Sequence, residues 1–269
     1  MSDLTRHSET GLDYILVGDA AAPKRIIVIL HGTGGDCENM KSKIAEPLAV
    51  LENTLFVIPN GPLSLASEIS DEQVEAIRAA QVASGGDPTF DRNKAFNWTG
   101  EASFTPEEGD AEGMLRALDE IITPIVGRIN KLIDDKLAEY GLSDGQLAFY
   151  GFSAGGMVAL HAAMERSKPC AAIISHSGHF LGARRCLSVP PVLMMYGDQE
   201  WQDSEIQGIF SQSIDLLRGL GLSVEQHACG NLGHGVNAES LDMAGLFLRR
   251  SFAMLKNSVP AALPSSIIS

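Results

Sequence analysis

Short apolar runs alternate along this chain with longer amphipathic stretches, and this alternation constrains the fold more than any other feature. The runs are RIIVILHG, NTLFVIPNGP, GQLAFY, CAAIISHSG and VPPVLMMYG, beginning at residues 25, 53, 145, 170 and 189, and a last strand is expected at SVEQHACG, beginning at 223. Unbroken apolar runs of this length are typical of parallel strands that are buried on both faces. The sequence therefore predicts an α/β protein with a mostly parallel, doubly wound sheet and helices on both faces.

Helical patterns fill most of the intervals between these runs. Helices are expected at residues 38–51, 70–83, 112–140, 154–167, 204–221 and 237–256. Ser70 and Gln73 have the spacing of a capping box, and Pro124 is the point at which the longest helix would break.

The length of 269 residues suits one large domain with a sizeable core. The chain shows no internal repeat and no low-complexity linker, so we expect a single domain over residues 1–256. Residues 257–269 are expected to form a flexible tail.

The stretch 63–110 is the least regular part of the sequence. It carries Gly85-Gly86, Pro88 and an aromatic cluster that consists of Phe90, Phe96, Trp98 and Phe104. A connecting segment of this length over one end of a sheet can supply a lid or a pocket wall. A surface insertion that packs its own small core is the alternative, and the sequence favours neither.

YGFSAGG places Ser153 between Gly151 and Gly155. Because the chain has 27 glycines, a G-x-S-x-G motif alone is weak evidence. Its context is more specific, since a buried strand precedes the serine and a helical pattern follows it. Strand, sharp turn and helix form the setting of a nucleophile elbow, in which small neighbours leave room for a strained backbone.

Other reactive side chains also follow predicted strands, where the site of a doubly wound sheet lies. Asp198, Glu200 and Asp203 follow VLMMYG, and His234 follows the last strand. A serine hydroxyl needs a nearby base, and a histidine base needs a carboxylate to orient it. The chain order of Ser153, acid and histidine is the order found in α/β hydrolases.

Three carboxylates compete for the role of the acid. Glu200 ranks first, because it lies three residues past Gly197 and the loop has room to turn toward His234. Asp198 ranks second and suits a turn cap. Asp203 ranks third, because it suits the cap of the helix that begins at Ser204.

Backbone amides of Thr33 and Ala154 are the candidates for an oxyanion hole. Thr33 could equally belong to an ordinary glycine-rich turn, and His234, between two glycines, could be a turn residue. His31 is expected to shape its loop rather than act as a base.

Several further residues have a functional and a structural interpretation. His176 and His179 could form a metal pair, but no third ligand stands out, so histidines of the core or of the pocket mouth are favoured. The candidates for lining a substrate pocket, with plain core packing as their alternative, are Trp98, Met157, Met194, Met195 and Trp201.

Bulk properties exclude several classes of partner. The net charge of −14 argues against nucleic acid and against an anionic membrane surface. The N-terminal MSDLTRHSETGLDY lacks the pattern of a signal peptide, and no apolar segment has transmembrane length. The four cysteines have no zinc-binding spacing. We expect a cytoplasmic monomer or homodimer without cofactor or metal, which acts on a small molecule.

Four motifs, LHGTGGD, GFSAGGMVAL, YGDQE and GHGV, resemble the phospholipase/carboxylesterase family of α/β hydrolases, which includes acyl-protein thioesterases. The resemblance covers residues 26–255. It implies a triad of Ser153, Glu200 and His234, with an oxyanion hole at the backbone of Thr33 and Ala154.

The sequence also departs from that family. The family usually has Asp where Glu200 stands and His where Tyr196 stands, and AFNWTGE replaces its usual A-W-F-D segment. LHGTGGD, FNW and SAGG also resemble polyhydroxybutyrate depolymerases and feruloyl esterases, which are typically secreted.

We therefore expect a serine hydrolase that cleaves carboxylic ester or thioester bonds through an acyl-enzyme. A polyester or feruloyl-type esterase is the alternative. The alternative of another class is a non-catalytic protein that binds a small ligand on a hydrolase fold, and a peptidase is a third option.

Overall fold

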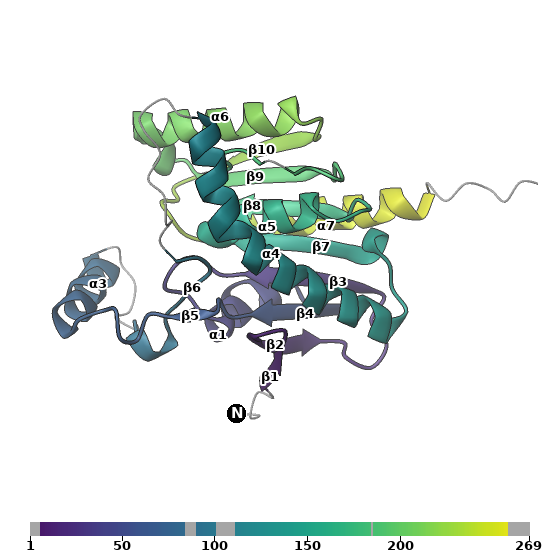
Figure 1. Ribbon diagram of the computed structural model, residues 1–269, viewed down its shortest axis with the longest axis horizontal. Coiled ribbons are helices and arrows are strands. Elements are labelled where there is room, and N and C mark those ends of the chain that lie inside the picture. Colours follow the sequence, from purple (N-terminus) through teal and green to yellow (C-terminus); the bar gives the residue numbers. More distant parts are fainter. Residues whose placement is uncertain (1–5, 84–89, 101–110, 184, 258–269) are drawn as a thin grey trace, which may run out of the picture.

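A twisted sheet of eight strands forms the centre of the computed structural model, which describes residues 6–83, 90–100, 111–183 and 185–257 (Figure 1). In spatial order the strands are β1 (Arg6–Glu9), β2 (Leu12–Gly18), β4 (Thr54–Pro59), β3 (Arg25–Leu30), β7 (Leu147–Phe152), β8 (Ala172–His176), β9 (Val192–Gly197) and β10 (Val224–Cys229). Strands β4, β3, β7, β8, β9 and β10 run parallel to one another. Strands β1 and β2 are antiparallel to their neighbours. The predicted mostly parallel sheet is confirmed.

Strands β1 and β2 were not predicted, because all four residues of β1 are polar and Asp13 interrupts the apolar residues of β2. They form a hairpin whose turn residues Thr10 and Gly11 have φ values of 56° and 75°. Two consecutive positive φ values are typical of the tight turns that match the twist of a hairpin. Tyr14 and Ile15 of β2 are nevertheless buried, and they extend the core to this edge of the sheet.

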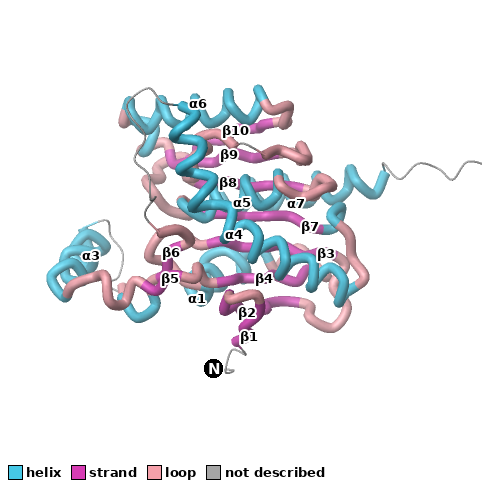
Figure 2. Tube along the Cα trace, in the orientation of Figure 1, coloured by secondary structure: helices cyan, strands magenta, loops and turns pink. Residues whose placement is uncertain are grey.

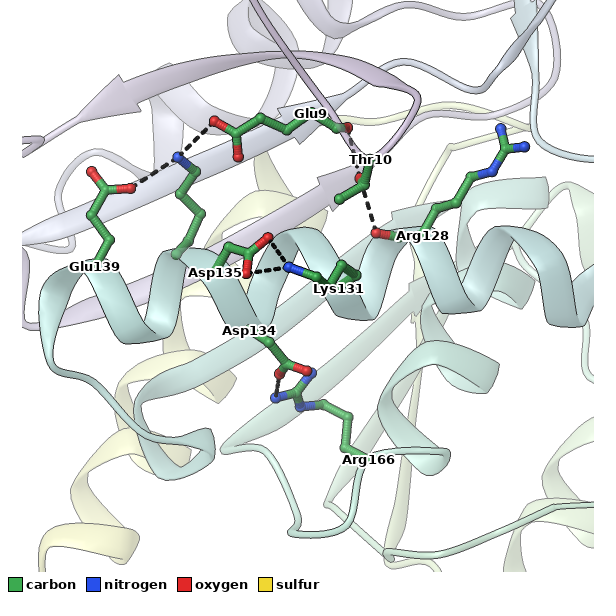
Figure 3. Close-up of polar contacts among 9 residues, drawn as sticks. Glu9, Thr10, Arg128, Lys131, Asp134, Asp135, Glu139 and Arg166 are labelled. Atoms are coloured by element: carbon green, nitrogen blue, oxygen red, sulfur yellow. Dashed lines mark hydrogen bonds and ion pairs between the residues drawn. The ribbon is translucent and has the colours of Figure 1, made fainter.

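Polar contacts join this hairpin to the long helix α4 (Ala111–Tyr140), as Figure 3 shows. The nearly buried Lys136 of α4 lies 2.9 Å from Glu139 Oε2 and 3.5 Å from Glu9 Oε1. The hydroxyl of Thr10 donates a hydrogen bond of 3.3 Å to the carbonyl of Arg128. Because a buried ammonium group needs partners, these contacts give the hairpin a defined position against α4.

Helices cover both faces of the sheet, as predicted (Figure 2). On one face α4 packs beside α5 (Ala154–Met164) and α6 (Ser204–Gly219). The other face is covered by α7 (Ala238–Asn257) and by a segment that contains α1 (Cys37–Met40) and α2 (Glu46–Leu48). None of the described helices is both long and apolar enough to cross a membrane.

The helix expected at 38–51 is shorter and less regular than predicted. A π-helical turn at Lys41–Ala45 separates α1 from α2. Pro47 follows it and has no amide hydrogen to donate to the carbonyl four residues earlier. The wider turn accommodates that missing bond.

Pro124 does not break α4, which is continuous through it. Its ring is exposed, while Ile122, Ile125 and Val126 beside it are at most 3 % exposed. Apolar burial on both sides of the proline offsets the backbone bond that the proline removes.

The described part of the stretch 63–110 extends beyond one end of the sheet. It contains the two-stranded ladder of β5 (Leu63–Ser64) and β6 (Phe96–Asn97), and α3 (Asp71–Ala83), which stands apart from the sheet at the left of Figure 1. The capping box is present, since Ser70 Oγ accepts from the Gln73 amide at 3.2 Å and Gln73 Oε1 accepts from the Ser70 amide at 2.8 Å. Gly85-Gly86, Pro88, Phe104 and the tail from residue 258 lie outside the described residues.

Candidate active site

Ser153 lies in the turn between β7 and α5 and has φ 53° and ψ −122°. This conformation is strained for a residue with a Cβ. Its amide donates a hydrogen bond of 2.8 Å to the carbonyl of His176 in the neighbouring strand. A Cβ on Gly151 would overlap the Gly155 carbonyl, and one on Gly155 would overlap the Leu30 carbonyl. The small residues predicted around the serine are therefore required by the close approach of strand and helix.

Glu200 and His234 lie in contact, 34 residues apart in sequence. Nδ1 of His234 is 2.7 Å from Glu200 Oε2. Because a carboxylate only accepts, neutral His234 carries its proton on Nδ1 and leaves Nε2 with a free lone pair. The arrangement gives the imidazole the tautomer that a general base needs.

The Glu200 carboxylate receives two further hydrogen bonds, both at Oε1. Ser177 Oγ donates at 2.6 Å and the Gly197 amide donates at 2.9 Å. Burial by itself raises the pKa of Glu200, but the hydrogen bonds from His234, Ser177 and Gly197 outweigh it and the pKa is lowered. The side chain is only 8 % exposed, and these donors keep it ionised at neutral pH.

The other two carboxylates of this loop have different partners. Asp198 Oδ1 accepts from the Leu232 amide at 3.1 Å. Asp203 caps α6 by accepting from the amides of Glu205 and Ile206, at 2.9 Å and 3.2 Å. Neither has a hydrogen bond to His234 within the described part of the chain, and Asp203 has the capping position predicted as its alternative.

His234 also lies close to the elbow. Its ring centroid is 5.0 Å from that of Phe152, the residue directly before Ser153. In the described residues no hydrogen bond joins the Ser153 hydroxyl to His234. Such bonds are often long in structures without substrate and shorten in the complex.

The loop after β3 contacts the elbow from the other side. A Cβ on Gly32 would lie 3.1 Å from Ser153 Cβ, so the two backbones approach closely. The Gly34 and Gly35 amides are bonded to the carbonyls of Phe96 and Gly32, at 2.9 Å and 3.0 Å. Among the described residues the Thr33 and Ala154 amides have no acceptor, which leaves both able to bind a substrate oxygen.

His31 holds this loop in place, as predicted. Its Nε2 accepts from the Gly61 amide at 2.8 Å, and its Nδ1 is 2.7 Å from the Gly32 carbonyl oxygen. Burial lowers the pKa of His31 to about 4, so the ring is neutral and both nitrogens are satisfied. Trp98 stacks on it at 4.6 Å and donates from Nε1 to the His31 carbonyl at 2.6 Å. Trp98 is 2 % exposed and lies beneath the loop, outside the lining of the adjacent cavity.

A cavity of about 820 Å³ opens beside Thr33 and His234. The stretch 63–110 supplies one wall through apolar side chains, and these are Leu65, Ile69, Ile77 and Phe90. Met40, Phe152, Val236 and Leu241 add further apolar surface from the body of the domain. Charged residues also line the cavity (Asp36, Lys43, Asp91 and Lys94), and its apolar part is suited to an apolar group attached to a carbonyl.

The remaining pocket candidates are placed outside this lining. Met157 packs partly buried against the core, and Trp201 stacks on Tyr196 at 4.5 Å. Met194 and Met195 are fully buried.

Of the two histidines considered as a metal pair, His176 is fully buried and His179 is partly buried. His176 Nδ1 is 2.7 Å from the Tyr150 hydroxyl, and the ring of His179 lies 4.8 Å from that of Phe210. The described residues contain no group of three or more His, Cys, Asp or Glu that could hold a metal ion.

Ser177 and the Gly197 amide are the site groups that the sequence analysis missed. Ser177 directly follows β8, so its position after a strand was the available signal. In that segment the sequence interpretation considered only His176 and His179.

Comparison with known proteins identifies the fold and the family. The Phospholipase/Carboxylesterase family model matches residues 109–250, more than half of the chain. Esterase PE8 is 24 % identical, with a TM-score of 0.64, over 87 % of this chain and 96 % of its own. The Zea mays acyl-protein thioesterase 2 is 20 % identical (TM-score 0.56; 91 % and 100 %), and a carboxylesterase from Mesorhizobium loti is 14 % identical (TM-score 0.60; 92 % and 99 %).

These structural similarities confirm the predicted α/β-hydrolase fold. The family match adds the activity class, which the fold alone does not give. The chain therefore belongs to the phospholipase/carboxylesterase family of α/β hydrolases and is a carboxylic ester hydrolase.

Proposed function

We propose that this hydrolase uses Ser153, His234 and Glu200 as a catalytic triad and works through an acyl-enzyme. The observation that carries the proposal is the hydrogen bond of 2.7 Å between His234 Nδ1 and Glu200 Oε2. It orients a neutral imidazole next to the strained turn that presents Ser153.

The first half-reaction forms the acyl-enzyme. Ser153 Oγ attacks the carbonyl carbon of the ester while His234 Nε2 takes the hydroxyl proton. The carbonyl oxygen becomes an oxyanion, which the amides of Thr33 and Ala154 stabilise. The imidazolium then gives its proton to the leaving alcohol or thiol, and the bond from the carbonyl carbon to that group breaks.

The second half-reaction restores the enzyme. A water molecule attacks the acyl-serine carbonyl and gives a proton to His234 Nε2. The same amides hold the second oxyanion. When the carbon–oxygen bond to Ser153 breaks, the proton passes to Oγ and the carboxylic acid leaves.

We propose further that the cavity beside Thr33 binds the apolar part of the substrate, with the described part of the stretch 63–110 as a wall. Two backbone hydrogen bonds fix this wall to the loop after β3, which carries Thr33. They run from Gly34 N to Phe96 O at 2.9 Å and from Phe96 N to Gly35 O at 3.2 Å. A wall bonded to the catalytic loop sets the size of the acyl group that reaches Ser153. These bonds favour a fixed wall over a separate surface insertion.

The test combines active-site labelling with turnover. The purified protein is treated with a fluorophosphonate probe, the modified residue is identified by mass spectrometry, and p-nitrophenyl esters of graded length are assayed. Label on Ser153 that disappears in Ser153→Ala and His234→Ala is the expected result. A folded protein with neither label nor turnover would contradict the proposal and favour the non-catalytic ligand-binding alternative.

A further inference from the structure

Ser177 lies where β8 leaves the sheet, and it is 1 % exposed. Its φ is 52°, in the left-handed region that side chains with a Cβ rarely adopt. Glycine would relieve this strain, so the conformation gives no reason for a serine. What serine adds over glycine at this position is a hydroxyl group.

That hydroxyl is bonded to the triad acid. Ser177 Oγ donates to Glu200 Oε1 at 2.6 Å, and the Gly197 amide donates to the same oxygen at 2.9 Å. The other oxygen, Oε2, faces His234 Nδ1 at 2.7 Å. Donors on both oxygens prevent the carboxylate from rotating about the Cγ–Cδ bond of Glu200. The orientation of the carboxylate plane toward His234 is therefore fixed.

The backbone of the same segment is bonded to the nucleophile. The carbonyl of His176 accepts from the Ser153 amide at 2.8 Å, and the Ser177 amide donates to Met195 O at 2.7 Å. One dipeptide, 176–177, therefore contacts both the turn that carries Ser153 and the loop that carries Glu200. The position of this dipeptide therefore helps to set the distance between Ser153 and Glu200.

We propose that Ser177 is a positioning residue for the ester hydrolysis, acting through Glu200 on His234. This rests on the proposed triad. Its hydroxyl fixes the carboxylate plane and withdraws electron density from Oε1. Without it, the carboxylate is freer to rotate and more basic, so His234 is held less precisely and its protonated form is stabilised more strongly.

Ser175 provides a matched control two residues earlier in β8. It is also fully buried, but its hydroxyl has no hydrogen-bond partner among the described residues. Ser177→Ala and Ser175→Ala each delete one buried oxygen from the same strand end. We expect Ser177→Ala to lower kcat about tenfold or more, as for loss of a hydrogen bond to a charged group, with little change in KM. Ser175→Ala should stay within about twofold of the wild type.

The pH profile separates positioning from packing. The acid limb of kcat/KM should move to higher pH in Ser177→Ala, because the more basic carboxylate favours protonated His234. Glu200 also faces His176 and His179, and burial lowers the pKa of both, that of His176 to about 4. Acidic groups near this loop include Asp198, Asp203, Cys229 and Glu239. The Ser175 hydroxyl has no hydrogen-bond partner among the described residues, so Ser175→Ala should leave the limb in place.

Ser177→Gly completes the experiment, because it removes the hydroxyl and relieves the backbone strain. We expect it to lose as much kcat as Ser177→Ala while unfolding at an equal or higher temperature. It also carries the test if the alanine variant does not fold.

Two outcomes would overturn the inference. One is wild-type kcat and an unmoved acid limb in the Ser177 variants, and the other is full recovery of kcat in Ser177→Gly. As a control, turnover is measured for the wild type and for Ser153→Ala, and it should be lost in Ser153→Ala. If that control fails, the triad proposal itself is wrong, whereas failure of Ser177 alone leaves the triad intact.

Discussion

The amide of Leu232 donates a hydrogen bond of 3.1 Å to Asp198 Oδ1, and this bond joins the loop after β9 to the loop that carries His234. Glu200, two residues beyond Asp198, instead contacts the imidazole at 2.7 Å. The two acids thus act on one loop in different ways. Asp198 holds its backbone, and Glu200 orients its side chain.

Glu200→Gln should therefore lower kcat by about three to four orders of magnitude, because an amide no longer enforces the tautomer with the proton on Nδ1. Asp198→Asn should keep most of the activity, since its side-chain oxygen still accepts from Leu232. Steady-state kinetics with p-nitrophenyl esters provide the measurement. An active Glu200→Gln together with an inactive Asp198→Asn would transfer the role of the acid to Asp198.

Buried neutral histidines should make the protein sensitive to acid. Burial lowers the pKa of His31, His161 and His176 to about 4. The unfolded chain takes up these protons near pH 6.5, whereas the folded chain does so only near pH 4. The unfolded state therefore binds more protons in that window, and the free energy of unfolding should fall as the pH is lowered from about 6.5 to about 4.

His161→Leu tests this dependence at one position. His161 Nε2 is buried without a partner in the described residues, and the ring packs 5.5 Å from that of Phe180. Leucine fills a similar volume without a group to protonate, so stability at pH 7 should change by about 1 kcal/mol or less. Urea unfolding at pH 7 and pH 5 should show a smaller loss than in the wild type. Parallel losses in the two proteins would contradict the assignment.

Trp98→Phe should destabilise the protein and slow catalysis. The phenyl ring retains the stacking on His31 but loses the hydrogen bond of 2.6 Å to the His31 carbonyl. Leaving that buried carbonyl without its donor costs about 1–3 kcal/mol. Urea unfolding measures the stability, and kcat reports on the adjoining Thr33 loop.

Trp201→Phe is the matched control for this substitution. Trp201 stacks on Tyr196 at 4.5 Å, and in the described part of the chain its indole nitrogen has no hydrogen bond. This variant should lose clearly less stability than Trp98→Phe. Equal losses would mean that ring size, and not the hydrogen bond, determines the effect.

Ile69→Trp should shift the substrate preference toward shorter acyl chains. Ile69 lines the cavity beside Thr33, and a larger side chain would fill part of its volume. Val82→Trp is the control, because Val82 is 56 % exposed on α3 and does not line the cavity. Rates with p-nitrophenyl esters of increasing length measure the effect. An unchanged profile in Ile69→Trp would place the acyl group elsewhere.

The sequence predicted the central strands well, because a strand buried on both faces leaves an unbroken apolar run. It did not predict β1, where Arg6, Ser8 and Glu9 interrupt the pattern, or β2, where Asp13 interrupts it. It also placed a break at Pro124, since burial of the neighbouring isoleucines is a tertiary effect that local propensity does not contain.

At the site, the positions of Ser153, Glu200 and His234 after strands could be read from the pattern. The choice among the acids depended on loop length, capping positions and the family resemblance, because side-chain directions are absent from a sequence. Ser177 escaped notice since its partner Glu200 is 23 residues away, and the contact depends on a left-handed backbone. The burial of Trp98 under the His31 loop could not be separated from pocket lining by residue type.

The close packing around the elbow has a consequence for large-scale mutagenesis. A Cβ at Gly151 or Gly155 would overlap backbone carbonyls, and one at Gly197 would overlap those of Leu232 and Gly233. A survey of every single substitution would therefore show these glycines to be as intolerant of substitution as Ser153, although a glycine has no side-chain atom that could react. Only an assay that scores abundance and turnover separately would distinguish them, because replacing a glycine should remove the folded protein, whereas under the proposed triad replacing Ser153 should leave it folded and inactive.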